Sequence, residues 1–61
     1  MQNLNSIPLN AARYQRAANI YADMAAEYHA AGKWALYREV ESERARMQAE
    51  ADLHKAALLV R

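Results

Sequence analysis

A chain of 61 residues is long enough for one small domain, and domains of this size bury little of their surface. Because the sequence contains no cysteine, disulfides and thiolate metal sites cannot supply additional stability. The formal net charge of +1, from 8 basic and 7 acidic residues, excludes an acidic mimic of nucleic acid and a polycationic tail. We therefore expect oligomerisation or a binding partner to stabilise the chain.

Residues 1–6 are polar, and we expect them to be loosely structured. They lack the basic region and the apolar run of a secretory signal. The longest purely apolar run, residues 56–60, is far shorter than the roughly 20 residues that cross a bilayer. The sequence predicts a cytoplasmic protein without a membrane segment.

The first predicted helix covers residues 8–31, within one domain over residues 1–61. It begins near Ser6, whose hydroxyl can accept a hydrogen bond from a free backbone amide, and Pro8 is tolerated in a first turn. From there, mostly apolar and aromatic residues recur at spacings of three and four, which indicates a helix that packs along one line. This row contains Ile7, Asn10, Tyr14, Ala17, Tyr21, Met24, Tyr28 and Ala31.

Gly32 is the only glycine and lies near the middle of the chain. Glycine can adopt a left-handed backbone conformation without a side-chain penalty, so it commonly ends helices. We predict a turn at Gly32 that joins two helices. The competing interpretation is one bent helix, because no strong capping residue precedes Lys33 and Trp34.

The second predicted helix covers residues 33–60. The same spacing recurs in it, at Tyr37, Val40, Arg44, Met47, Ala51, His54 and Leu58. In an antiparallel hairpin the residue numbers of facing pairs have a nearly constant sum. The two rows then pair as Tyr28 with Tyr37, Met24 with Val40, Tyr21 with Arg44, Ala17 with Met47, Tyr14 with Ala51, Asn10 with His54, and Ile7 with Leu58.

This register also places opposite charges across the hairpin, Glu27 with Arg38 and Arg13 with Asp52. The predicted fold class is therefore all-α, an antiparallel two-helix hairpin. Small side chains off the two rows let helices approach closely, so we expect two hairpins to form a homodimeric four-helix bundle. The candidate dimer-face residues are Ala18, Ala22, Ala25, Ala45, Ala49, Leu53, Ala56 and Val60; Ala11 lies on the same side of the first helix.

No nucleophile and base pattern is present, and a single glycine excludes a phosphate-binding loop. Glu50 and His54 are four residues apart, but no further ligand completes a metal site. Glu43 and Arg46 are expected to pair along one exposed helix face. We expect neither an enzyme nor a cofactor.

The sequence favours a small regulator, adaptor or inhibitor that binds a protein partner through its helix faces. Its size is typical of phage or mobile-element products directed at a host protein. Tryptophan, tyrosine and arginine dominate the energetics of protein interfaces. The candidate contact residues are therefore Lys33, Trp34, Tyr37 and Arg38; the alternative role of Trp34 is to cover the end of the core.

Two other functions remain open. Arg13, Arg16 and Lys55 could bind RNA or DNA, and the architecture resembles that of the Rop type of helical-hairpin dimer, which binds paired RNA loops. The chain could also be a structural subunit of a larger assembly. The segment from Tyr21 to Trp34 also resembles the first helix and turn of a tetratricopeptide repeat, but the second helix departs from that pattern.

Overall fold

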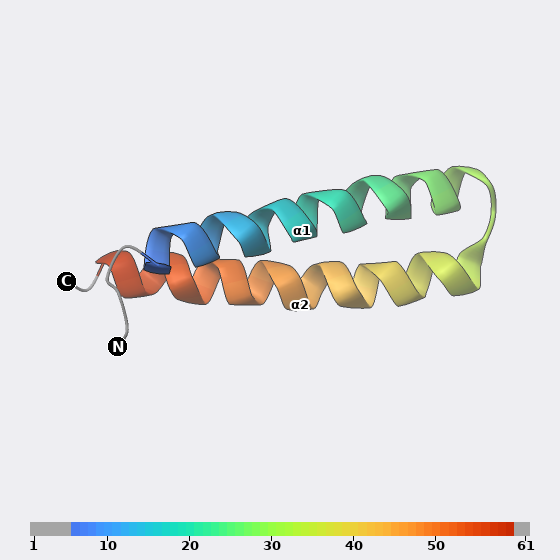
Figure 1. Ribbon diagram of the computed structural model, residues 1–61. Coiled ribbons are helices and arrows are strands. Elements are labelled where there is room, and N and C mark those ends of the chain that lie inside the picture. Colours follow the sequence, from blue (N-terminus) through green and yellow to red (C-terminus); the bar gives the residue numbers. More distant parts are fainter. Residues whose placement is uncertain (1–5, 60–61) are drawn as a thin grey trace.

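The structure is a computed structural model that describes the backbone of residues 6–59 and the side chains of residues 10–59. This part of the chain consists of two helices, α1 (Ser6–Ala30) and α2 (Trp34–Leu59). The helices lie side by side and antiparallel, with the turn at one end and the outer ends of both helices at the other (Figure 1). The predicted all-α hairpin is confirmed, and the alternative of one bent helix is not what the chain forms.

The helix ends lie within two residues of the predicted ones. Because α1 begins at Ser6, Pro8 lies in the first turn, where the amide proton that proline lacks would have no helical partner. The predicted loose segment, the cap by the Ser6 side chain, the contact of Ile7 and the dimer contact of Val60 lie outside the described residues.

The turn at Gly32 closes α1 with a Schellman motif. Gly32 has a φ of 71°, and its amide donates to the carbonyl oxygen of His29 at 3.1 Å. The Lys33 amide donates to the carbonyl oxygen of Tyr28 at 2.9 Å. These two bonds satisfy carbonyl groups that the helix end would otherwise leave free, and they require the left-handed conformation at Gly32. The predicted role of Gly32 is confirmed.

Lys33 occupies the N-cap position of α2, since its carbonyl oxygen accepts the first helical bond, from the Tyr37 amide at 2.9 Å. An ammonium group cannot accept a hydrogen bond from the free amides of the first turn. It also lies at the positive end of the helix dipole. The structure therefore contains a cap position with an unsuitable residue.

We expect Lys33→Asp to stabilise the hairpin by about 1 kcal/mol, because a carboxylate can accept from these amides and complements the dipole. Urea unfolding followed by circular dichroism measures the change. Lys33→Gln is the control, since it removes the charge with little capping. Equal stability of the two variants would contradict the capping argument.

Small side chains form the most deeply buried part of the hairpin. Ala11, Ala18 and Ala25 are seven residues apart and follow one line of α1 against α2. The buried residues of α2 are Val40 and Ala51. Alanine lets the two backbones approach closely, so the contact line runs along these residues, and larger side chains lie half-buried beside it.

This contact line corrects part of the predicted packing. Ala18 and Ala25 were expected on an outer face, but they lie inside the hairpin at 1% and 3% exposure. Ala17 and Met24, expected at the centre, are half-buried at its margin, and Ala31 is exposed beyond the end of α1. On α2 every predicted row position is buried or half-buried, so that row is confirmed.

The shift of the contact line also separates the predicted ion pairs across the hairpin. Arg13 and Glu27 are turned away from α2 and exposed. Among the described side chains, the ion pairs lie within α2 instead, Arg44 with Glu41 at 3.1 Å and Arg46 with Glu43 at 2.6 Å. The Glu43 and Arg46 prediction is confirmed, and those of Glu27 with Arg38 and Arg13 with Asp52 are wrong.

Candidate functional site

An aromatic cluster occupies the turn end of the hairpin. The His29 ring meets the edge of Trp34 at 5.0 Å and that of Tyr37 at 5.2 Å between ring centres. Trp34 and Tyr37 also meet edge to face, at 6.3 Å. Edge-to-face contacts are the favourable geometry for aromatic rings, so they restrict the orientation of Trp34. The indole is nevertheless 53% exposed.

All four predicted partner-contact residues belong to this end of the molecule. Lys33, Trp34 and Arg38 are exposed, and Tyr37 is half-buried. The structure adds His29 to the cluster. The sequence signal for His29 was its position three residues before Gly32, because the Schellman motif brings the end of α1 back over the start of α2.

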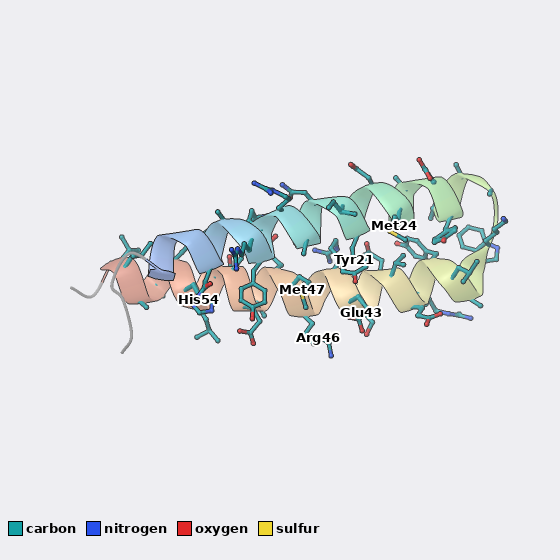
Figure 2. The ribbon with its side chains drawn as sticks, viewed as in Figure 1. Tyr21, Met24, Glu43, Arg46, Met47 and His54 are labelled. Carbon is teal, nitrogen blue, oxygen red and sulfur yellow. The ribbon has the colours of Figure 1, made fainter. Side chains whose placement is uncertain are left out.

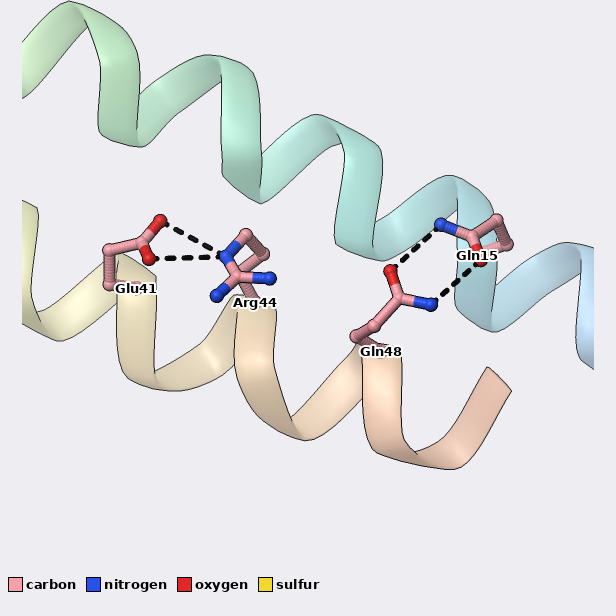
Figure 3. A network of polar contacts seen from close by, with 4 residues as sticks. All are labelled: Gln15, Glu41, Arg44 and Gln48. Carbon is pink, nitrogen blue, oxygen red and sulfur yellow. Dashed lines mark hydrogen bonds and ion pairs between the residues drawn. The ribbon is translucent and has the colours of Figure 1, made fainter. Parts of the chain in front are cut away.

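One broad side of the hairpin carries a polar network, and we call it the glutamine side. The amides of Gln15 and Gln48 exchange hydrogen bonds across the helices, at 3.0 and 2.9 Å (Figure 3). Each amide nitrogen donates a second bond within its own helix, to Asn19 and Asp52 respectively, both at 3.0 Å. The Lys55 ammonium donates to the Gln15 oxygen at 2.7 Å. This network ties α1 to α2 in one register.

The glutamine pair was not predicted from the sequence, because neither residue belongs to an apolar row. Asp52 was predicted to pair with Arg13, whereas the Asp52 carboxylate accepts from Gln48. His54 was expected to face Asn10, but its ring stacks on Tyr14 at 5.3 Å with 9° between the planes. Arg44, expected beside the Tyr21 ring, binds Glu41.

The opposite broad side is more apolar, and we call it the methionine side. Figure 2 looks onto this side and shows Tyr21, Met24 and Met47 along it, with Glu43 and Arg46 at the outer edge of α2. In Figure 3, α1 again lies above α2 but runs in the opposite direction across the picture. Figure 3 therefore shows the hairpin from the glutamine side. The three aligned side chains are half-buried, so each retains exposed apolar surface.

Three more exposed apolar residues lie on or beside the methionine side. Ile20 follows the buried Ala18 by two residues and so lies toward the outer edge of α1, Leu36 lies two turns before Glu43 on this side, and Leu53 follows the buried Ala51 by two residues and so lies toward the outer edge of α2. Their exposures are 54%, 41% and 64%. The hairpin extends 45 × 16 × 15 Å, so residues 6–59 form a single layer of helices in which no described segment covers this side.

The candidate nucleic-acid residues come partly together. Lys55 reaches α1 through its bond to Gln15, next to Arg16 in sequence. Arg13 and Arg16 are exposed on α1. Arg13 follows the buried Ala11 by two residues, so it lies toward the outer edge of α1, in line with Ile20 two turns later.

The alanine and leucine residues that were expected to form a dimer face do not form one continuous surface. Ala18 and Ala25 are buried within the hairpin, while the others that the structure describes are exposed. The exposed members are Ala22, Ala45, Ala49, Leu53 and Ala56. Of these residues, only Leu53 borders the methionine side.

The described residues contain no pocket and no group of three or more histidine or carboxylate side chains that could hold a metal ion. Neither α1 nor α2 has a stretch that is long and apolar enough to cross a bilayer. Comparisons of the chain with family models, curated proteins and solved structures found no match.

Proposed function

We propose that this chain is a small non-enzymatic regulator, adaptor or inhibitor that binds a protein partner with the turn end of its hairpin. The observation that carries the proposal is the environment of Trp34. Its side chain is half-exposed, yet its ring is held by edge contacts with the rings of His29 and Tyr37. A large side chain that is ordered before binding loses little conformational entropy when a partner covers it. Such preorganised aromatic residues are typical hot spots of protein interfaces.

The charged residues around Trp34 support the same proposal. Lys33 and Arg38 lie beside it on the exposed surface. Cations around an aromatic centre form the polar rim that many interfaces have. The preferred partner surface would then offer an apolar pocket with acidic residues at its edge.

We expect Trp34→Ala to lose capture of the partner while the helix content stays unchanged, because Trp34 is half-exposed and its ring contacts are with His29 and Tyr37 at the turn end. A tagged chain is used to capture proteins from native lysate, with and without nuclease, and the bound proteins are identified by mass spectrometry. Leu59→Ala is the matched control, since Leu59 is an exposed apolar residue at the other end of α2.

Three outcomes separate the functions. One stoichiometric protein that survives nuclease and is lost only with Trp34→Ala supports the proposal. Recovery of nucleic acid, with binding that weakens steeply as salt rises, would replace it with RNA or DNA binding through Arg13, Arg16 and Lys55. Equal capture by both variants would show that the partner binds a surface other than the turn end.

We also propose that the hairpin is a homodimer in a four-helix bundle. The support for this proposal is the methionine side, with Leu36 exposed on it and Ile20 and Leu53 exposed beside it. Clusters of exposed apolar side chains mark interaction surfaces on small proteins. This surface is separate from the Trp34 cluster, so self-association and partner binding could occur together.

A further inference from the structure

We propose that the second copy packs on the methionine side with its turn at the opposite end, so that α1 lies antiparallel to α1 and α2 to α2. This inference rests on the proposed homodimer and adds its surface and its orientation. The orientation is inferred from the order of charged and apolar residues along each helix. The order on α1 and the order on α2 each favour this orientation independently.

On α1, the relevant residues are Arg13, Ile20 and Glu27. They are seven residues apart, so they share one face, and all three are exposed. When two copies of α1 run antiparallel about Ile20, Ile20 meets its own counterpart. Arg13 of each copy then meets Glu27 of the other, so one row supplies an apolar centre and two opposite-charge pairs.

The margin of this row is also complementary. Ala17 and Met24 lie half-buried next to the row, on either side of its centre. In the same antiparallel arrangement, Met24 of one copy comes level with Ala17 of the other. A large side chain thus packs beside a small one, as interdigitated helices require.

On α2, two antiparallel pairs share one centre. Leu36 of one copy comes level with Leu53 of the other, and Glu43 comes level with Arg46. Within one hairpin Glu43 and Arg46 already pair at 2.6 Å, so both are held at this edge of α2 (Figure 2). The centre of both pairs lies between Arg44 and Ala45.

The two centres agree with the observed register of the hairpin. The hydrogen bond between Gln15 and Gln48 places these two residues level with each other. Because the helices are antiparallel, five residues further along α1 correspond to five residues back along α2, so Ile20 lies level with Glu43. This position is within two residues of the centre on α2, or about 3 Å along the helix. One two-fold axis through the middle of the methionine side therefore generates both sets of contacts.

The other orientation, with both turns at the same end, fits less well. It would place α1 against α2 of the second copy, with Ile20 level with Glu43 and Glu27 level with Leu36. An apolar residue would then face a carboxylate in both pairs. In addition, acidic residues outnumber basic ones near the turn, and basic ones outnumber acidic ones toward the described outer ends. Opposed turns bring these unlike halves together.

Cysteine cross-linking of the full chain tests the orientation, because the natural sequence has no cysteine. We expect Ile20→Cys to form a disulfide-linked dimer with mild oxidant at least about tenfold faster than Ala26→Cys, which places a thiol on another exposed face of α1. Arg13→Cys and Glu27→Cys should each cross-link poorly alone. The two copies of either residue would be about 21 Å apart. An equimolar mixture of these two variants should form the mixed disulfide.

A second variant tests the same surface without a covalent bond. Ile20→Glu places two carboxylates together at the proposed axis, and we expect it to raise the dimer dissociation constant by at least about tenfold in sedimentation equilibrium. Ala26→Glu, an equal change of charge on another face, should leave the constant unchanged. Circular dichroism of each variant verifies that the helices are retained.

The outcomes distinguish this inference from the proposals on which it rests. A dimeric natural chain whose Ile20→Cys variant cross-links no faster than Ala26→Cys would overturn this surface and leave the homodimer intact. A natural chain that stays monomeric at about 100 µM would overturn both. Neither result bears on Trp34, whose variant is tested by partner capture.

Discussion

Replacement of Ala51 by aspartate is expected to unfold the hairpin. Ala51 has 0% exposure, so its side chain is fully covered within the hairpin. A carboxylate at this position loses its hydration, and the larger side chain also forces the helices apart. We expect a loss of at least about 3 kcal/mol, and a hairpin of this size is too marginally stable to withstand it. Circular dichroism should show the loss of helix content and of a cooperative urea transition.

Ala49→Asp is the matched control for this experiment. It makes the same replacement in the same helix two residues away, at an exposed position. The cost there should be limited to helix propensity, about 0.5 kcal/mol. If both variants unfolded equally, the close alanine contact would not be what holds the helices together.

Replacement of Gly32 by alanine is expected to lower the free energy of unfolding by about 1–2 kcal/mol, because an L-residue is strained in the left-handed region. No atom lies within 4 Å of the position that the new methyl group would occupy, so the cost arises from the backbone conformation alone. The Gly32 φ of 71° is the observation behind this expectation. Urea unfolding of the purified chain measures the loss.

Gly32→Asn separates backbone strain from the addition of a side chain. Asparagine visits the left-handed region more readily than alanine, so it should cost less. A Gly32→Asn variant as unstable as the Gly32→Ala variant would argue against strain as the cause. Sedimentation equilibrium completes the test, because relief of the strain by one continuous helix would change the oligomeric state.

The sequence predicted the two helices and their turn because these features depend on local chemistry. The residues near Gly32 favour helices on both sides, and one glycine supplies the left-handed residue that ends α1. The row on α2 was also correct, because its apolar positions recur with the helical period. Trp34 was identified as a candidate contact from its residue type and its place beside the turn.

The errors concern distances between the helices. Spacing alone does not distinguish Ala17 from Ala18 as the residue nearest α2, since each is three or four residues from both Tyr14 and Tyr21. The choice depends on how closely two backbones approach, and the smaller side chains at Ala11, Ala18 and Ala25 allow the closer contact. This rotation of α1 carried Arg13 and Glu27 away from their predicted partners.

Local propensity and helical periodicity indicate where the chain forms helices, where it turns and that the two helices run antiparallel. The three-dimensional arrangement, by contrast, establishes which line of α1 is buried, that Gln15 and Gln48 join the helices, and that the hairpin has a polar and an apolar side. Those features result from packing between residues far apart in the chain. Which residues remain exposed, and hence where a partner or a second copy can bind, follows from that packing.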